Sequence, residues 1–312
     1  MKDLLGIDSE FLKECKIVDW AYTEELRPKT YEYYLEWVAK DLHGPLKYLS
    51  DERKDKRKSL DEVYPGATGA LVFLFDYRPA KNLLNSTDPT NKIAAYTLGF
   101  EGQDYHLWIR EKLESIAKNL ELTDYGVSLD VHPVLERDLA FRSGLGWFGK
   151  NSMIINREFG SYFLIGSLIL KEKLSLNTKP IEPDHCGTCT RCIDACPTDA
   201  IIAQTRTIDS AKCISTFTIE LFKDAPAPAG YPTESNEVFG CDICQEVCPW
   251  VKKSLGQEEM ESNWLIEFFN RPQSEIYEEV SALSNKKFKE KFKHTSMERL
   301  GKRGLLKNLK KV

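Results

Sequence analysis

The chain has 312 residues, 42% of them hydrophobic and 29% charged, which is ordinary for a globular protein of about two domains. Its apolar runs fall short of the roughly 18 residues that a membrane span needs, and its charged N-terminus does not resemble a secretory signal. The formal net charge of −5 excludes the strongly basic class, and nine cysteines in such a chain indicate metal binding in the reducing cytosol.

Positive charge is concentrated near the C-terminus. Residues 285–312 contain 11 Lys or Arg and two Glu, a net of +9, so the rest of the chain carries −14. A basic segment on an acidic body is typical of proteins with a polyanionic partner, but a solvated helical face would have the same composition. Charge alone leaves both interpretations open.

Apolar spacing predicts that helices and strands alternate through the first 178 residues. In chain order we expect a helix over 29–43, a charged loop or short helix over 51–58, a buried strand over 66–77 and a helix over 104–122. A short strand over 127–131, a helix over 134–143 and two strands over 151–156 and 162–170 follow. Asp104 is the expected N-cap of the second long helix, and Gly144 ends the third. This alternation predicts an α/β layer domain.

A polar linker separates this domain from a cysteine-rich module. Residues 177–183 contain two prolines, and eight of the nine cysteines follow before about residue 255. A mostly helical basic tail ends the chain. We therefore expect three parts, 1–178, 179–255 and 256–312.

Two cysteine runs in the module have the spacing of iron–sulfur ligands. The first is Cys186-x-x-Cys189-x-x-Cys192-x-x-x-Cys196-Pro197, and the second is Cys241-x-x-Cys244-x-x-x-Cys248-Pro249, with Cys213 between them. The first run is the bacterial-type pattern, in which three cysteines bind one [4Fe–4S] cluster and the fourth binds another.

This rule assigns every cysteine of the module. The cluster that we call cluster one takes Cys186, Cys189, Cys192 and Cys248, and cluster two takes Cys196, Cys213, Cys241 and Cys244. Cys213 is included because the second run is one ligand short. Zinc is the alternative for Cys-x-x-Cys pairs, but the triplet that ends in Cys-Pro favours iron and sulfur. Cys15 lies outside the module and is expected in the hydrophobic core.

Three shorter motifs look like ligand sites but are set aside. Residues 144–149 match G-x-G-x-x-G and residues 144–150 match G-x-x-x-x-G-K, yet a helix precedes them, a strand follows, and Asn151 replaces the Ser or Thr that binds magnesium. Their glycines would permit a tight turn or the close approach of a large flat ligand. Asp130-Val131-His132 begins like a cobalt-binding motif, but Leu135 stands where that motif has glycine.

Asp130 is the candidate acid by its position. It lies at the end of an expected strand, where α/β domains often place their chemistry, and a partly desolvated carboxyl there would have a raised pKa. An Asp before a helix is also a common cap, so the local pattern leaves both roles open.

The chain as a whole resembles epoxyqueuosine reductase. The resemblance rests on Asp104-Tyr105-His106, on Asp130-x-x-Pro133-Val134-Leu135-Glu136-Arg137, on the run from Ala140 to Asn151, on Gly160-Ser161-Tyr162, and on the eight-cysteine module with Cys213-Ile214-Ser215 and Thr218-Ile219-Glu220. It extends from about residue 46 to the C-terminus. The glycine-rich run before the module is specific, since ferredoxins share only the cysteines.

The resemblance implies a cobalamin-dependent oxidoreductase that reduces epoxyqueuosine to queuosine at the wobble position of tRNA. The first domain would have a nitroreductase-like α/β (α+β) fold, followed by a bacterial-type two-[4Fe–4S] ferredoxin domain and the short helical basic tail. Cobalamin would be bound base-off, with no protein ligand to cobalt. By position, Asp130 matches the family's proton donor, and the cobalamin contacts fall on Arg57, Asp130, Ile154, Ile165 and Ser215.

The resemblance also implies partners. They are a tRNA with epoxyqueuosine in its anticodon loop and an external one-electron donor of the flavodoxin or ferredoxin type, and the enzyme would be a cytoplasmic monomer. In the tail, near-helical spacing would let a basic row face the anticodon stem, formed by Arg299, Lys302, Arg303 and Lys307. Tyr105 and His106 are the alternative proton source, although their place at a helix start favours a structural role.

Two departures from the family keep other functions open. Longer members carry a C-terminal helical-repeat extension that is not found here, so we expect a smaller tRNA contact surface. The family's usual Asp-Thr-Gly-Pro is Asp130-Val131-His132-Pro133 in this chain, and the bulkier His132 would suit a cobalamin-dependent reductase of another small molecule. A two-cluster electron carrier and an RNA-binding protein with structural clusters are the remaining alternatives. The block 130–162 disfavours the carrier, and the redox-type cysteine spacing disfavours the RNA-binding protein.

Overall fold

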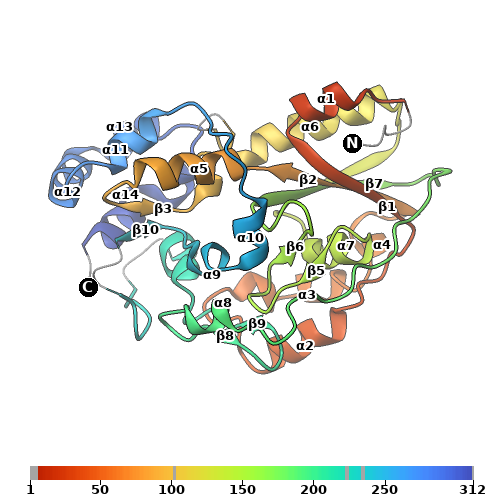
Figure 1. Ribbon diagram of the computed structural model, residues 1–312, viewed down its shortest axis with the longest axis horizontal. Coiled ribbons are helices and arrows are strands. Elements are labelled where there is room, and N and C mark those ends of the chain that lie inside the picture. The colour runs from red at the N-terminus through yellow and green to blue at the C-terminus, as the bar shows by residue number, and fades with distance from the viewer. Residues whose placement is uncertain (1–5, 101–102, 222–224, 233–235, 311–312) are drawn as a thin grey trace.

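A four-stranded sheet organises the first part of the chain (Figure 1). The computed structural model describes residues 6–100, 103–221, 225–232 and 236–310, so the extreme ends of the expected first domain and tail lie outside the described residues. The strand order is β1-β2-β7-β4, with bounds Ile17–Thr23, Gly69–Asp76, Phe163–Leu170 and Tyr125–Ser128. The strands expected over 66–77, 127–131 and 162–170 are confirmed as β2, β4 and β7, whereas β1 was not predicted.

All neighbouring strands of this sheet are antiparallel, so the first part is α+β rather than a parallel α/β layer. Alternating elements are misleading here because the helices between β1 and β2 do not cross back over the sheet. The first of them lies beside the cysteine module, where Trp37 Nε1 donates to the carbonyl of Ile208 at 2.7 Å. The last packs through Leu60 into the same hydrophobic cluster as Val72 and Leu74 of β2. These helices are α2 (Tyr31–Ala39), η1 (Lys47–Leu49), α3 (Arg53–Lys56) and α4 (Leu60–Val63).

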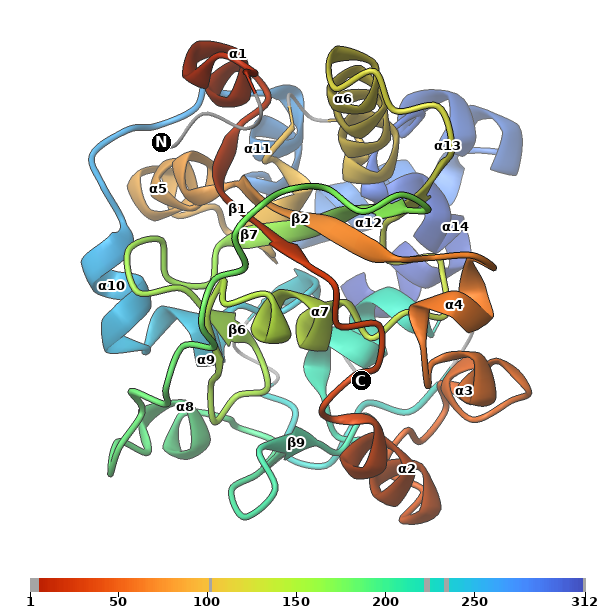
Figure 2. The same ribbon diagram turned by 90° about the vertical axis from the view of Figure 1, so that its right-hand side faces the viewer.

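The two faces of the sheet pack against different helices, as Figure 2 shows with α1 and α6 on one side and α7 on the other. Along β2, Leu71 and Phe73 join the α1 and α6 side, and Val72 and Leu74 join the α7 side. Coverage of both faces explains the burial of this apolar strand. The elements on the two faces are α1 (Ser9–Glu14), α6 (Tyr105–Asn119), α7 (Glu136–Arg142), β5 (Trp147–Phe148) and β6 (Ile154–Ile155).

Local chemistry sets the helix ends. The Asp104 carboxylate accepts the His106 backbone N–H at 2.8 Å, which confirms the expected N-cap of α6. Helix α7 begins two residues later than predicted, because the Val134 N–H is used in a tight turn to the carbonyl of His132. Gly144, with φ of 77°, ends α7 as expected. Cys15 is the buried C-cap of α1, so its expected place in the core is confirmed.

The cysteine module consists of short elements around its ligand loops. Strand β10 pairs in parallel with β3, and β8 and β9 form a small hairpin. The bounds in chain order are α8 (Arg191–Asp194), β8 (Ile201–Ile202), β9 (Thr207–Ile208), the π-helical turn η3 (Thr216–Glu220), β10 (Glu237–Phe239), α9 (Ile243–Glu246) and α10 (Pro249–Ser254).

The C-terminal part is helical, as expected, and it packs into the rest of the molecule. One hydrophobic cluster contains residues from all three expected parts, including Leu83, Val251 and Phe292. The borders near 178 and 255 stay predictions, and this cluster crosses both. The remaining elements are α5 (Arg78–Thr87), β3 (Lys92–Ile93), η2 (Ala95–Thr97), α11 (Trp264–Phe269), α12 (Gln273–Ala282), α13 (Asn285–Lys291) and α14 (Ser296–Leu309). Within the described ranges, no helix has the length and apolar character to span a membrane.

Candidate active site and cluster ligands

The thiols expected to hold cluster one lie together. Burial, with the nearby charges of Cys186 and Cys248, raises the pKa of Cys192 to about 11. Burial also raises the pKa of Cys248, and Cys186 and Cys189 add to that increase. The two sequence-distant parts of this set, 186–192 and 248, are therefore neighbours in space.

The thiols expected to hold cluster two form a second group. Burial raises the pKa of Cys213, and the charge of Cys196 contributes. Burial likewise raises the pKa of Cys241, with contributions from Glu237 and then from Cys244 and Cys213. Cys213 thus lies between the two halves of the module, next to partners that are 17 and 28 residues away in sequence.

The donor chemistry of these two groups fits [4Fe–4S] clusters, which are held by four thiolates each. All nine cysteines are free of disulfides. Among the described residues, no three Cys, His, Asp or Glu side chains converge as a site for a single ion.

Asp130 occupies a left-handed turn after β4, with φ of 50°. Its Oδ2 accepts the Tyr105 hydroxyl at 2.5 Å and lies 3.5 Å from His106 Nε2. Its backbone N–H donates to Glu136 Oε1 at 2.5 Å, which holds the turn in place. The Asp130 side chain is 54% exposed, yet burial still opposes its charge. We use the name concavity for this partly open region around Asp130, which Tyr105, His106 and Glu136 border.

The proton near Asp130 resides on His106. Burial acts to raise the pKa of Asp130, but hydrogen bonds and charge from His106 and Tyr105 outweigh it and lower that pKa below its usual value. The expected raised pKa is therefore wrong. For His106, burial is outweighed by contacts with Asp104 and Asp130, which raise its pKa to about 9. Its Nδ1 lies 2.6 Å from Asp104 Oδ1, so both ring nitrogens face carboxylates and the imidazolium is favoured.

Tyr105 and His106 are therefore more than structural members of a helix start. They hold the Asp130 carboxylate directly, at the distances given above. The Asp104-Tyr105-His106 motif was the sequence signal for this role. Expectation favoured the structural role because the 24 or more residues between the motif and Asp130 hide the contact.

Glu136 is a second protonated group beside the acid. Burial, with the charge of Asp130, raises the pKa of Glu136 to about 8. A neutral carboxyl here accepts the Asp130 N–H without adding a second negative charge. The next residue, Arg137, has an exposed side chain whose pKa burial nevertheless lowers, so it lines the same concavity.

Several charged groups converge around Tyr48 at the opening of the concavity. Burial raises the pKa of Tyr48 to about 12, and the charges of Glu220 and Asp130 act in the same direction, against Arg299 and Arg57. Arg299 Nη2 lies 3.2 Å from Glu220 Oε2. The concavity therefore combines residues of η1, η3 and α14 with Arg57, which follows α3, and Asp130, which follows β4.

Arg57 carries an unsatisfied group. It is 7% exposed and lies 5.7 Å from the ring centroid of Tyr34, but its Nη1 has no hydrogen-bond partner in the described chain. A buried guanidinium N–H without an acceptor is costly and is usually satisfied by a ligand or by water.

The other expected cofactor contacts are hydrophobic or backbone positions. Ile154 of β6 is buried, and Ile165 of β7 packs against the same hydrophobic cluster on the α7 face of the sheet. Ser215 precedes η3, two residues after Cys213, and leads toward Glu220. Sequence analysis missed Tyr48 and Glu220, although the Thr218-Ile219-Glu220 run of the resemblance was a signal for Glu220.

The motifs that were set aside have other partners. The order of α7, glycines and β5 is confirmed, which is the reverse of a dinucleotide site. A Cβ on Gly146 would lie 2.3 Å from the carbonyl oxygen of Ile155, so the glycine permits close packing of the hairpin. The His132 ring lies 5.7 Å from the Tyr64 ring, and burial lowers its pKa.

Some residues of the expected basic row on the tail make contacts within the protein, and others are exposed. Lys307 is buried, donates to the carbonyl of Phe217, and lies 3.8 Å from the centroid of that ring. Lys302 donates to the carbonyls of Ser281 and Leu283. The expectation that Lys307 faces RNA is wrong, because α14 is amphipathic and turns this residue toward η3. Arg303 is exposed.

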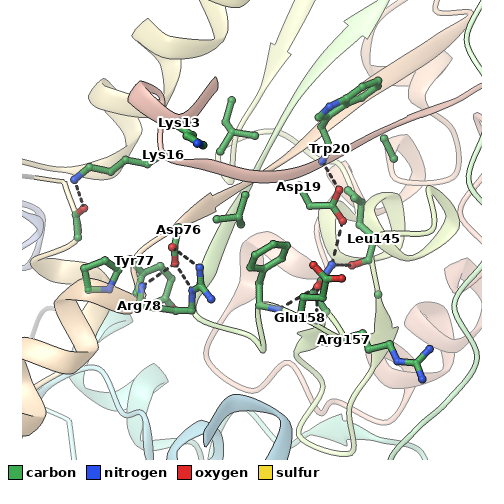
Figure 3. A pocket seen from close by; sticks show the side chains of 18 of the residues that line it. Lys13, Lys16, Asp19, Trp20, Asp76, Tyr77, Arg78, Leu145, Arg157 and Glu158 are labelled. Atoms are coloured by element: carbon green, nitrogen blue, oxygen red, sulfur yellow. Dashed lines mark hydrogen bonds and ion pairs between the residues drawn. The ribbon is translucent and has the colours of Figure 1, made fainter. Parts of the chain in front are cut away.

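A cleft of about 1680 Å³ lies away from Asp130, between α1, β1, the start of α5 and residues 156–159 (Figure 3). None of the expected site residues lines it. Asp76 and Arg78 pair across 2.8 Å, and Asp19 pairs with Lys179 at 2.6 Å. These two ion pairs neutralise four of the charged wall residues, and we assign the cleft no role.

Comparison with known proteins identifies the family. The family model "4Fe-4S double cluster binding domain" matches residues 185–251, and "Epoxyqueuosine reductase QueG" matches residues 57–134. The epoxyqueuosine reductase of Cyclobacterium marinum is 42% identical over 253 residues, which are 78% of this chain and 76% of that one. The chain belongs to the epoxyqueuosine reductase family.

Solved epoxyqueuosine reductases share the fold. A crystal structure with a tRNA-Tyr epoxyqueuosine-modified stem loop is 26% identical, with a TM-score of 0.70 over 96% of this chain and 78% of that one. The Bacillus subtilis structure, whose catalytic aspartate loop is swung out of its active site, is 25% identical, with a TM-score of 0.73 over 98% and 81%. This epoxyqueuosine reductase is an oxidoreductase, and residues 185–251 are its double-cluster, electron-carrying domain.

Proposed function

We propose that the chain reduces epoxyqueuosine to queuosine at the wobble position of tRNA, in a concavity that adjoins two [4Fe–4S] clusters. The single observation that carries the proposal is the Asp130 carboxylate held by Tyr105 and by a protonated His106, and open to solvent on its remaining side. The match to a family member solved with an epoxyqueuosine-modified tRNA stem loop supports the substrate.

The reaction consumes two electrons and two protons. Both C–O bonds of the epoxide break, a C=C double bond forms, and the oxygen leaves as water. The electrons come from an external one-electron donor of the flavodoxin or ferredoxin type. The proton held by His106 passes from its Nε2 to Asp130 Oδ2, 3.5 Å away, and from Asp130 to the departing oxygen. Water then reprotonates His106, so the second proton follows the same route.

Cobalamin fits the residues that face the concavity. Arg57 has a buried Nη1 without an acceptor, and Ser215 with the backbone of Ile154 and Ile165 would complete the cradle beside Asp130. When bound, cobalamin supplies a low-valent cobalt centre able to open an epoxide. His132 packs against Tyr64, consistent with base-off binding without a protein ligand to cobalt.

The proposal includes a cytosolic, monomeric enzyme. Eight reduced thiols arranged for iron–sulfur clusters require a reducing compartment. The exposed Arg303, together with Arg299 at the concavity, would contact phosphates beside the modified base.

The test combines cofactor analysis with turnover. Anaerobically purified protein is analysed for iron, sulfide and corrinoid, and is then assayed with reductant on tRNA that contains epoxyqueuosine, with products read as nucleosides. Conversion to queuosine that requires cobalamin is the expected result. Bound cobalamin without conversion would instead indicate a reductase of another small molecule, for which His132 beside Asp130 is the favouring feature. Iron without any corrinoid binding would indicate an electron carrier.

A further inference from the structure

The turn between β5 and β6 contacts the ligand loops of both clusters. Lys150 Nζ donates to the carbonyl of Gly187 at 2.7 Å and to that of Cys189 at 2.9 Å. The next residue, Asn151, donates its Nδ2 to the carbonyl of Cys244 at 3.3 Å. Two consecutive side chains of the first domain therefore hold one ligand loop of each cluster.

The turn is rigid, so these contacts are fixed in place. The Gly149 N–H donates to the carbonyl of Met153 at 2.8 Å, and the Ser152 N–H donates back to that of Gly149 at 3.0 Å. Arg137 Nη1 donates to the Ser152 carbonyl at 2.7 Å, which ties the turn to the helix after Asp130. A Cβ at Gly149 would lie 2.6 Å from Asn151 Oδ1, so glycine at this position leaves room for the Asn151 side chain.

The charge of Lys150 is not neutralised by a carboxylate. Its half-buried ammonium contacts two carbonyls, and it forms no ion pair within the described ranges of the chain. Arg206 provides the contrast, because it also reaches this hairpin, at the carbonyl of Phe148, but pairs with Asp184 at 2.7 Å. Lys150 is therefore a cation beside the cluster-one loop whose charge no carboxylate of the described residues neutralises.

We propose that Lys150, a positioning residue, raises the reduction potential of cluster one through its fixed positive charge. This inference rests on the two clusters of the proposed function. Reduction adds one negative charge to a cluster, and a fixed positive charge nearby stabilises the reduced form and raises the potential. Asn151 makes the corresponding contact near cluster two without a charge. The turn thus biases the first electron toward cluster one.

That bias matches the positions of the two clusters. The cluster-one loop is exposed at Gly187 and Thr188, where an external donor can approach. The segment that follows Cys213 forms η3 and ends at Glu220, whose Oε2 lies 3.2 Å from Arg299 Nη2 at the concavity. Cluster two is therefore the one toward the concavity, and electrons from a donor meet cluster one first.

The test is a redox titration of the full-length, cluster-loaded protein, followed by electron paramagnetic resonance without tRNA. Lys150→Gln should lower the reduction potential of cluster one by at least about 59 mV, which corresponds to a tenfold change in its one-electron reduction equilibrium. The reduction potential of cluster two should stay unchanged. Lys150→Arg keeps the charge and should restore most of the shift. Lys173→Gln is the matched control, because Lys173 is exposed and pairs with Glu24, far from the cysteines.

An unchanged potential in Lys150→Gln, or an equal shift in Lys150→Arg or Lys173→Gln, would overturn the role of Lys150. Should Lys150→Gln fail to retain iron, Lys150→Met, which keeps the apolar stem, is titrated in its place. The potential is measured independently of turnover. A wild type that does not reduce epoxyqueuosine in tRNA would refute the proposed function. An active enzyme whose cluster potentials do not shift in Lys150→Gln would refute only this inference.

Discussion

The cysteine module and the Asp130 concavity hold charge in opposite ways. In the module, burial raises the pKa of Cys192 to about 11 and also raises that of Cys213, so the thiols stay protonated until metal replaces their protons. In the concavity, the lowered pKa of Asp130 and the pKa of about 9 for His106 leave a charged pair before any ligand binds. The module takes its charge state from its metal, whereas the concavity takes it from its own residues.

The largest expected effect comes from removing a thiol that this comparison makes dependent on metal. Cys213→Ser should lose cluster two, about half of the roughly eight iron atoms, and all turnover, since the fourth ligand bridges the halves of the module. Iron and sulfide analysis with the anaerobic assay checks this. Cys15→Ser is the control, because Cys15 is a buried thiol that lies outside the module. A Cys213→Ser protein that keeps its full iron content would contradict the ligand assignment.

Asp130→Asn tests proton transfer in the concavity and leaves the cysteine ligands unchanged. The amide cannot pass protons, so turnover should fall roughly 10²- to 10⁴-fold while iron and cobalamin contents stay at wild-type levels. Val131→Ala is the matched control in the same turn, because Val131 is 62% exposed. Wild-type turnover in Asp130→Asn would remove Asp130 from the mechanism, and cofactor loss would make it a binding residue instead.

The pH dependence of turnover tests whether His106 supplies the proton in the concavity. Turnover of the wild type should fall as pH rises through about 9, because His106 then loses the proton that it returns to Asp130. His106→Gln should be slow at every pH and lack that limb. Because the folded pKa lies above the ordinary 6.5, the ion pair also contributes stability that is fully present below about pH 6.5 and is lost as pH rises through about 9.

The stability readout separates this pair from general alkaline effects. Chemical unfolding of wild type and His106→Gln at pH 6 and pH 10 should give a larger difference at pH 6. Equal differences at both values would mean that the imidazolium is not the stabilising species. A turnover limb near pH 9 that persists in His106→Gln would place the titrating group elsewhere.

The sequence predicted the features that depend on short spacing. The cysteine runs are local patterns, and so are the apolar residues of β2 and the N-cap of α6 at Asp104. Each depends on residues within one turn, one strand or one ligand loop. For the same reason, Asp130 could be nominated, because a strand end before a helix is visible in the chain.

What the sequence could not predict depends on pairing across distance. Antiparallel order in the sheet is decided by which strands meet, not by the alternation of elements. The charge state of Asp130 depends on His106 and Arg299, which come from distant helices and cannot be placed by periodicity. Lys307 looked like a surface charge because its burial against Phe217 requires knowing how α14 docks.

The smallest effects should come from the tail, where two positive charges of one helix differ in environment. Arg303 is exposed, whereas Lys307 donates to the buried carbonyl of Phe217. If Arg303 meets a tRNA phosphate, Arg303→Ala should reduce the slope of log affinity against log salt by roughly 0.7–0.9. Lys307→Met should leave that slope unchanged but lower the free energy of unfolding by about 1–2 kcal/mol, because the Phe217 carbonyl loses its donor. Filter binding over a salt series and urea unfolding measure the two. Equal slopes for both variants and the wild type would mean that the tail serves packing alone.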